Sequence, residues 1–200
     1  MAEPTAPSDR ARVRRRAQRA DYDRATIHAI IDEALICHVG FVVDGAPRVI
    51  PTIHARIDDT VYLHGSVASR MLRTLREGVP ACLTVTILDG LVLARSAFHH
   101  SMNYRSVVVH GVAREVVDRD EKLRALEAVT NHVVPGRWDV ARRPNATEVT
   151  TTLVLAMPID EASAKVRTGP PIDDPEDMGL DVWAGVVPVS SVRGEPIPDV

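Results

Sequence analysis

The stretch that decides the fold is "ICHVGFVVDGAPRVIPTIHARI", residues 36–57. An apolar, β-branched run over residues 36–43 leads into Asp44-Gly45, and a second extended run follows it. Asp-Gly favours the tight two-residue turn of a hairpin, in which both central residues take positive φ. Because a tight turn joins antiparallel neighbours, this stretch predicts an antiparallel hairpin.

Further strand-like runs follow the hairpin along the chain. They cover residues 60–65, 81–88, 91–98, 102–117, 148–159, 161–169 and 182–190. Asp58-Asp59 and Asp89-Gly90 each predict a turn between two strands. A twisted antiparallel sheet of this size tends to close into a barrel, because closure removes exposed edges. The predicted fold is therefore mainly β, with short helices inserted.

Three segments have the spacing of short amphipathic helices. They are residues 25–35, 66–78 and 118–134. Ser66 and Asp118 are the expected N-caps of the second and third helices, and Gly78 is a stop signal for the second. "PGRWDVARRPN", residues 135–145, has the composition of a loop.

The composition is that of a soluble globular protein of 200 residues with net charge −3. We expect a basic, flexible arm over 1–20, a single domain over 21–190 and a tail over 191–200. No apolar run reaches membrane-spanning length, so a cytoplasmic location is expected. The net charge gives no global case for nucleic acid, and the arm is either a solvated extension or a contact for an acidic partner.

Several site classes lack their sequence patterns. His99 and His100 are adjacent, so in an extended chain their side chains point to opposite faces and do not chelate one ion together. HExxH and paired-cysteine patterns are absent, and we expect no metal site. GxSxG, GxGxxG and GxxxxGK[ST] are absent too. Cys37 and Cys82 lie in apolar runs and are expected to be buried free thiols.

"YLHGSVASRML", residues 62–72, places a strand end before a helix start. Unpaired N–H groups at a helix start favour an anion, with Ser66, Ser69 and Arg70 as further donors. An ordinary serine cap explains the same residues, so a phosphate site is one of two interpretations.

The polar start of the strand over residues 103–109 is a second set of donors. Asn103 and Arg105 lie on one face of it, and Tyr104 and Ser106 on the other. These side chains either meet a ligand or face solvent.

The order of "RVIPTI", "VYLHGSVASRML", "FHHSMNYRSVVVHG" and "VWAGVVP" resembles the pyridoxamine 5′-phosphate oxidase-like superfamily, over roughly residues 20–190. The branch it is most similar to contains flavin-nucleotide-binding and nitroimidazole-resistance proteins. The resemblance implies an antiparallel split β-barrel and a homodimer with FMN at the subunit interface. The residues it implies for the cofactor are Arg48, Val49, Ile50, Pro51, Thr52, Ser66, Ser69, Arg70, Asn103, Tyr104, Arg105, Ser106 and Trp183.

Two departures from the oxidases argue against true pyridoxamine-phosphate oxidase activity. The phosphate segment reads Ser69-Arg70-Met71 where the oxidases have Ser-Arg-Lys, and no Arg-x-His segment follows near the end. The resemblance also implies a functional histidine at His64, with pocket lining as the alternative. Trp183 either closes a partner's flavin site or is a core residue.

The leading hypothesis is an FMN-dependent oxidoreductase acting on a small acceptor, such as a nitroaromatic. A non-catalytic flavin-binding redox sensor or cofactor store is the first alternative. A haem- or deazaflavin-binding relative in the same fold is the second.

Overall fold

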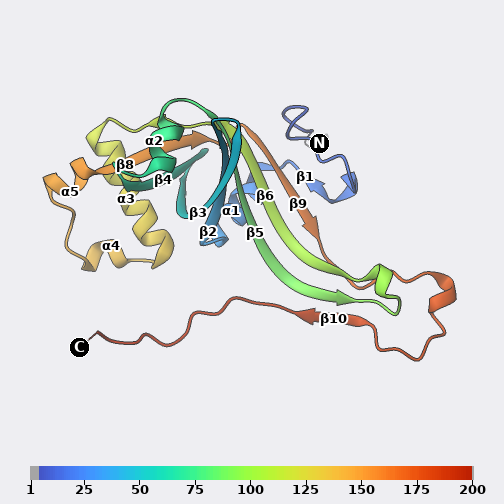
Figure 1. Ribbon diagram of the computed structural model, residues 1–200. Helices are drawn as coiled ribbons and strands as arrows, with labels where there is room; N and C mark the ends of the chain where they lie inside the picture. Colours follow the sequence, from blue (N-terminus) through green and yellow to red (C-terminus); the bar gives the residue numbers. More distant parts are fainter. Residues whose placement is uncertain (1–4, 200) are drawn as a thin grey trace. The chain divides into compact units, whose positions relative to one another are not determined.

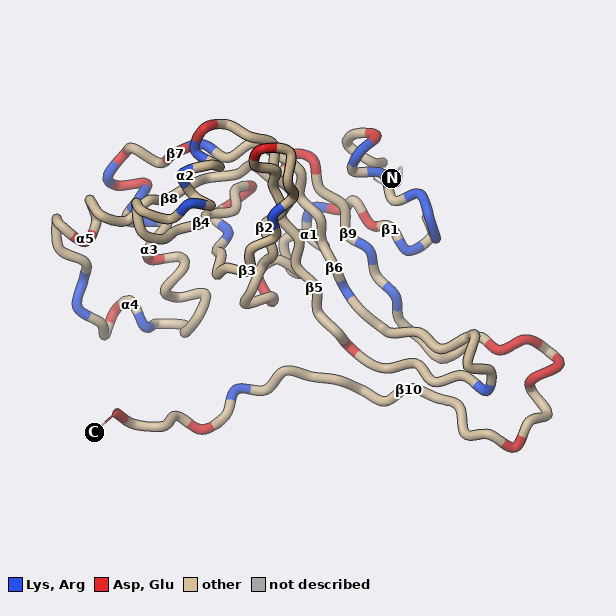
Figure 2. The backbone as a smooth tube through the Cα atoms, viewed as in Figure 1, with Lys and Arg blue, Asp and Glu red and all other residues tan. Residues whose placement is uncertain are grey.

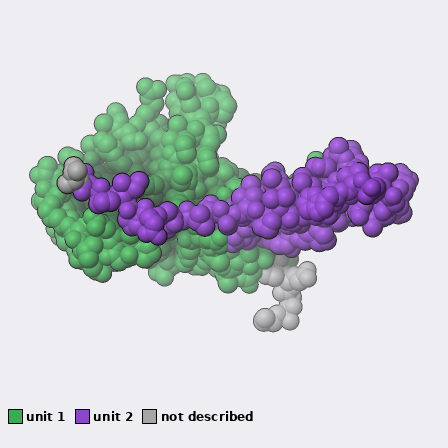
Figure 3. Space-filling view, turned by 90° about the horizontal axis from the view of Figure 1, so that it is seen from below, with its two compact units in different colours: residues 1–86, 106–165 green, residues 87–105, 166–200 purple. Residues whose placement is uncertain are grey.

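The computed structural model describes residues 5–199, which form mainly antiparallel β-sheet with short helices (Figure 1). The chain divides into two compact units (Figure 3). The first contains the residues up to Thr86 together with 106–165. The second contains 87–105 and the residues from 166 onward. Each unit is described separately below.

The strands of the first unit lie in the order β1-β9-β6-β5-β2-β3-β4-β8-β7. Their bounds are β1 Ala20–Asp21, β2 Ile36–Val43, β3 Ala46–Ile57, β4 Thr60–Ser66, β5 Pro80–Leu93, β6 Ser101–Val112, β7 Arg114–Glu115, β8 Thr152–Pro158 and β9 Glu161–Arg167. The unit boundaries fall within β5, β6 and β9. In the second unit, β10 Gly185–Pro188 pairs antiparallel with the end of β5.

The predicted hairpin is confirmed, and β2 and β3 have the predicted bounds. Val43 pairs with Ala46 around a two-residue turn. Asp44 and Gly45 have φ of 50° and 76°, the left-handed values that this turn requires. The next turn, at Asp58, also has positive φ and joins β3 to β4.

Two of the predicted helices are confirmed. Helix α1 runs over Arg24–Glu33 and buries Ile27, Ile30 and Ile31, while the Asp23 carboxylate accepts from its first N–H groups. Helix α3 runs over Arg119–Val133 and packs against β3 and β4. The Asp118 side chain caps α3 as predicted, accepting from the N–H of Glu121 at 2.8 Å.

The prediction for the start of the second helix is wrong. Helix α2 spans only Arg70–Arg76, and its N-cap is Ser69, whose Oγ accepts from the N–H of Leu72 at 3.4 Å. Ser66 is instead the last residue of β4. Two serines three residues apart offer the same capping chemistry. The pairing of Ser66 with Thr152 keeps the chain extended as far as Ser66, so the helix starts later, with Ser69 as its N-cap.

The turn predicted at Asp89-Gly90 is also wrong, because β5 continues through both residues. Arg105 holds the Asp89 carboxylate with two hydrogen bonds of 3.0 and 2.8 Å. A Cβ on Gly90 would lie 2.9 Å from Val186 Cγ1 and 3.2 Å from the Val187 carbonyl oxygen. The glycine therefore permits close approach of β10 and does not make a turn.

The strand predicted over 148–159 begins four residues later, because α5 occupies Ala146–Thr151. Asn145 and Glu148 form a capping box, which outweighs the β propensity of the threonines that follow. Part of the predicted loop 135–145 is helical as well, as α4 Arg137–Val140. The 3-10 helices are η1 Ala17–Arg19, η2 Ala97–His99 and η3 Pro175–Asp177.

The described part of the arm packs on the first unit. Ala11 is only 2% exposed, and the N–H of Val13 donates to the Tyr22 hydroxyl at 3.0 Å. The arginine side chain of residue 10 pairs with Glu161. Residues 1–4 lie outside the described residues.

The core of the first unit joins helices and strands. Its largest fully buried side chains include Ile31 of α1, Leu72 and Leu75 of α2, and Leu63 and Leu155 of the strands. Both cysteines are free, as predicted, with Cys37 buried and Cys82 half-buried. Within the described residues, no helix has the length and apolarity needed to span a membrane.

Candidate functional site

A pocket of about 480 Å³ opens in the first unit. It is lined by Phe41, Val43, Asp44, Arg48, Ile50, Ser69, Arg70 and Met71. Three segments contribute: the end of β2, the start of β3 and the start of α2. The volume lies within the range of small-molecule sites.

Strand alternation decides which hairpin residues reach this pocket. Phe41 pairs directly with Arg48, and Val39 pairs with Ile50, so these residues share one face of the hairpin. Val49 and Pro51 belong to the opposite face. The structure thus brings Arg48 and Ile50 to the pocket and turns Val49 and Pro51 away from it. Thr52 shares the face of Arg48 but is not among the lining residues.

The opposite face of the hairpin is apolar and exposed. Ile36, Val42, Val49 and Ile53 project from it, and Val49 is 63% exposed. Exposed apolar side chains are individually common, but a contiguous row on a sheet is typical of an interaction surface. We call this row the outer hairpin face.

Helix α2 supplies the other wall of the pocket. Ser69 and Arg70 stand at its first turn, and the burial of Leu72 and Leu75 fixes the helix against the core. The Ser69 Oγ already accepts from a backbone N–H, which leaves its hydroxyl hydrogen able to donate elsewhere. Because α2 has only seven residues, its dipole adds little to an anion site.

The electrostatics of the pocket favour an anionic group. Arg48 and Arg70 both line it, and neither side chain has a hydrogen bond or ion pair with any residue that the structure describes. Asp44 is the one carboxylate among the lining residues. Two guanidinium groups beside apolar side chains suit a ligand with a phosphate and a flat apolar part.

The predicted residues of β6 are engaged elsewhere and do not line this pocket. In the second unit, Asn103 donates to the Gly169 carbonyl at 3.1 Å and accepts from Arg167, while Arg105 is held by Asp89. In the first unit, Ser106 Oγ donates to the Lys165 carbonyl at 3.3 Å. Tyr104 is half-buried.

Thr52, Ser66 and Trp183 also lie outside the pocket lining. Thr52 pairs with Cys37 on the hairpin, and Ser66 Oγ accepts from the N–H of Ala68 at 3.1 Å. In the second unit, Trp183 is 65% exposed, so the core interpretation of this tryptophan is wrong. Its ring covers Gly185, where a Cβ would lie 2.8 Å from Cζ2.

His64 lies on β4 opposite Val154 and is half-buried. Its Nδ1 is buried and has no hydrogen-bond partner within residues 5–199. Burial lowers the pKa of His64, which keeps the imidazole neutral near pH 7. A neutral imidazole with an unused nitrogen is a competent metal or haem ligand.

The two adjacent histidines have separate partners, in agreement with their predicted divergence. His99 Nε2 lies 3.0 Å from Asp174 Oδ2, and His100 Nδ1 lies 3.1 Å from the Ser96 carbonyl oxygen. The ligand atoms of His99, Asp174 and Asp177 lie within 4.8 Å of one another. No sequence spacing indicates this group, because His99 and Asp174 are 75 residues apart. Exposed carboxylates commonly gather without an ion.

Sequence reasoning missed half of the pocket lining. Phe41, Val43, Asp44 and Met71 were not predicted. Alternation along the hairpin was the available signal for Phe41 and Val43, since both share a face with Arg48.

A mainly antiparallel sheet with short helices and a cationic pocket beside its first hairpin defines a class, the split-barrel proteins. The family model described as pyridoxamine 5′-phosphate oxidase matches residues 23–166. The chain belongs to this family, which confirms the resemblance. No curated protein matches the chain.

Two solved structures are similar over nearly their whole length. The flavocytochrome Anf3 from Azotobacter vinelandii is 44% identical, with a TM-score of 0.92 over 98% of this chain and 91% of that one. The FAD and heme binding protein from Mycobacterium smegmatis is 37% identical, with a TM-score of 0.87 over 90% and 89%. A putative 5-nitroimidazole antibiotic resistance protein from Bacteroides thetaiotaomicron is 26% identical, with a TM-score of 0.62 over 74% and 86%.

Proposed function

We propose that this chain is an oxidoreductase that binds a flavin nucleotide and a haem. The observation that carries the proposal is the pocket in which Arg48 and Arg70, without protein partners among the described residues, stand beside Phe41 and Ile50. The two relatives above 30% identity, a flavocytochrome and an FAD- and haem-binding protein, support it.

In this proposal Ser69 and Arg70 hold the flavin phosphate, and the Arg48 guanidinium adds a second positive charge. Two forked cations in one pocket suit a diphosphate, which supports FAD over the FMN that the resemblance implies. Backbone groups of residues 48–52 remain our proposal for the ring edge. A bound flavin supplies electron transfer, while the protein binds and orients it.

The histidine inventory favours His64 as the haem ligand. Five of the eight histidines have a ring nitrogen within 3.1 Å of a protein oxygen, namely His28, His54, His99, His100 and His132. Of the remaining three, His38 is exposed and His110 lies near the positive charge of Arg10. His64 combines partial burial with an unused nitrogen. An iron–imidazole bond requires a neutral ring, which its environment favours.

We further propose a homodimer in which the outer hairpin face is covered by a second copy. A monomer would leave Val42 and Val49 in water, and covering them is favourable by about 25 cal/mol for each Å² of apolar area. Sedimentation of the full chain tests this. We expect a dimer, and Val49→Glu shifts it toward monomer. A monomeric wild type contradicts the dimer.

The absorbance spectrum of the purified chain tests the cofactors. We expect flavin bands and a Soret band, with FAD released on denaturation. His64→Ala should lose the Soret band and keep the flavin, whereas His100→Ala, an exposed control away from the outer hairpin face, should keep both. A chain that takes up neither flavin nor haem on titration contradicts the proposal. If His64→Ala loses both cofactors and its circular-dichroism spectrum is that of an unfolded chain, His64→Gln takes its place as the test of the haem ligand.

Turnover separates the enzyme from the non-catalytic module. Oxidation of a nicotinamide or chemical reductant by the loaded protein, with oxygen or a nitroaromatic as acceptor, supports the oxidoreductase. Flavin and haem binding with no turnover across these acceptors favours the sensor or store.

A further inference from the structure

The arm concentrates positive charge in a chain that is acidic overall. Residues 10–19 contain six arginines and no acid. Because the whole chain carries −3, the remainder carries −9. Figure 2 shows these arginines as the blue stretch between the N-terminus and β1.

Two of these arginines already hold carboxylates of the first unit. Arg10 pairs with Glu161, and the Nη2 of Arg14 donates to both carboxylate oxygens of Asp9, at 2.8 and 2.7 Å. Guanidinium groups of this segment therefore already bind carboxylates.

The remaining nearby acids are committed to other groups. Asp21 accepts from the Thr26 hydroxyl at 2.9 Å and from the N–H of Asp23 at 2.8 Å. The Asp23 carboxylate caps α1. Arg24 pairs with Asp59 beyond the segment. The acidic side chains nearest to the segment therefore already have hydrogen-bond or ion-pair partners.

Four cations are left over. Arg12, Arg15, Arg16 and Arg19 have no hydrogen-bonded or ion-pair acid among the residues that the structure describes. Arg12, Arg15 and Arg16 are exposed, and Arg19 is half-buried. We call these four residues the arginine cluster.

The backbone beneath the cluster is held in place. Ala11 is buried, the N–H of Val13 donates to the Tyr22 hydroxyl, and the N–H of Arg19 donates to the Arg16 carbonyl at 2.9 Å. Arg16 adopts the left-handed conformation, with φ 57° and ψ 52°. A residue other than glycine takes this conformation at a cost, which the surrounding contacts must offset. The cations are therefore displayed on an ordered turn, which reduces the entropy lost on binding.

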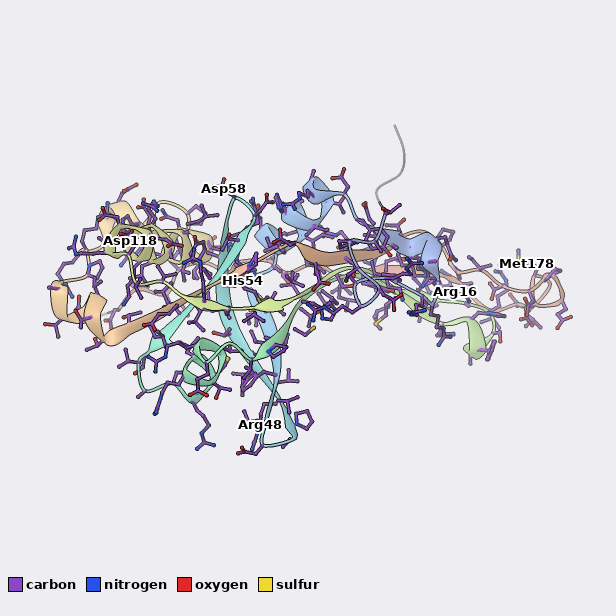
Figure 4. The ribbon with its side chains drawn as sticks, turned by 90° about the horizontal axis from the view of Figure 1, so that it is seen from above. Arg16, Arg48, His54, Asp58, Asp118 and Met178 are labelled. Atoms are coloured by element: carbon purple, nitrogen blue, oxygen red, sulfur yellow. The ribbon has the colours of Figure 1, made fainter. Side chains whose placement is uncertain are left out.

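We propose that the arginine cluster docks the carboxylate-rich face of a partner protein. Arg16 lies well away from Arg48 in the first unit, so this surface is separate from the pocket (Figure 4). Complementary charge of this kind speeds encounter and selects the partner. A compact acidic patch matches four cations on one short turn.

The same features argue against nucleic acid. A duplex extends as a long line of negative charge, and the −9 of the remaining chain would repel the part beyond the cluster. Stacking platforms are missing from residues 10–19, which contain no aromatic residue.

Fluorescence anisotropy with labelled poly-L-glutamate and with a labelled DNA duplex tests the proposal on the full chain. We expect poly-L-glutamate to bind at low salt and to dissociate as salt rises, because exposed charge pairs are screened. Arg12→Gln, Arg15→Gln, Arg16→Gln and Arg19→Gln together should weaken binding at least about tenfold. Tyr22→Phe frees the turn without changing the charge and should weaken binding by a smaller factor.

A matched control removes four exposed arginines elsewhere on the first unit. Arg73→Gln, Arg119→Gln, Arg124→Gln and Arg137→Gln produce the same change in net charge and should leave binding within about twofold. Equal losses in the two quadruple variants would mean that net charge alone acts, which overturns the proposal. So would absence of poly-L-glutamate binding at low salt. Tighter binding to the duplex would reassign the cluster to nucleic acid.

Discussion

His54 and His132 meet beneath the C-terminal end of α1, with ring centroids 5.0 Å apart. Each donates from Nε2 to a carbonyl of that helix end, His54 to Ile31 and His132 to Ala34, both at 2.9 Å. The last carbonyls of a helix have no partner within the helix, and a strand and another helix supply one here. His54 lies among the strands of the first unit (Figure 4).

Removal of the His54 ring should destabilise the fold. His54→Ala leaves a cavity at a fully buried site and an unpaired carbonyl at Ile31, at a cost of about 2–4 kcal/mol. Urea unfolding followed by circular dichroism measures this loss. His100→Ala removes an exposed ring of the same size and should change the stability by less than about 0.5 kcal/mol. Equal costs at the two positions would contradict the capping role.

Stability should fall on mild acidification. Burial lowers the pKa of His54 and of His64 below the ordinary imidazole value of 6.5. Below that value the unfolded chain binds more protons than the folded chain, so stability is fully present above pH 6.5 and declines beneath it. The measurement is the urea midpoint between about pH 8 and pH 5. Replacing both histidines with glutamine should flatten the curve, and a midpoint that rises toward acid refutes the assignment.

A second loss should follow in stronger acid. Hydrogen bonds from Arg114 and Arg142 lower the pKa of Glu121 and Glu148, the latter to about 2. A carboxyl with a depressed folded pKa contributes stability that is lost as the pH falls from the unfolded value through the folded one. Both carboxylates are half-buried but pair with exposed arginines, so the expected effect is small and salt-dependent. High salt should suppress this second decline and leave the histidine step in place.

Gly90 should be intolerant of a side chain. Gly90→Ala places a Cβ against Val186 and the Val187 carbonyl, and the pairing of β10 with β5 should loosen by about 1–3 kcal/mol. Hydrogen exchange at the amides of residues 185–187 reports on this pairing. Gly179→Ala is the control, because nothing lies within 4 Å of its Cβ position. Unchanged protection in Gly90→Ala would show that the pairing of β10 with β5 tolerates the added methyl group, and would contradict this prediction.

The pocket arginines should govern flavin affinity if our functional proposal holds. Arg48→Ala and Arg70→Ala should each weaken binding about tenfold to a hundredfold, the range for losing a charge-assisted hydrogen bond. Fluorescence quenching of FAD measures the affinity. Arg73→Ala, on the same helix but outside the pocket lining, should leave it unchanged. A matching loss in Arg73→Ala would show a general charge effect.

Local signals predicted the elements that local chemistry decides. The Asp44-Gly45 turn, the cap at Asp118 and the buried stripe of α1 each follow from a few adjacent residues. Asp89-Gly90 carries the same turn signal as Asp44-Gly45. There the approach of β10, from almost a hundred residues along the chain, keeps the strand straight. Sequence alone does not contain that contact.

The candidate pocket was also predicted only in part, because contacts between distant segments decide which side chains reach it. Arg48, Ile50, Ser69 and Arg70 reach one pocket, as a family pattern allowed us to expect. Asn103 and Arg105 have the donors that a ligand needs, yet partners from distant segments satisfy both side chains. Side-chain type gives the chemistry that a residue can perform, and only tertiary contacts decide whether it is still available.

The alternation along β3 also restricts how this hairpin can change in evolution. Arg48 and Ile50 point into the pocket, while Val49 and Ile53 point outward. Inserting or deleting a single residue between Ala46 and Arg48 would exchange the two sets, putting a charge on the outer hairpin face and valine in the pocket. Substitutions can adjust either face separately, but the length of this segment cannot change by one residue without exchanging the two faces.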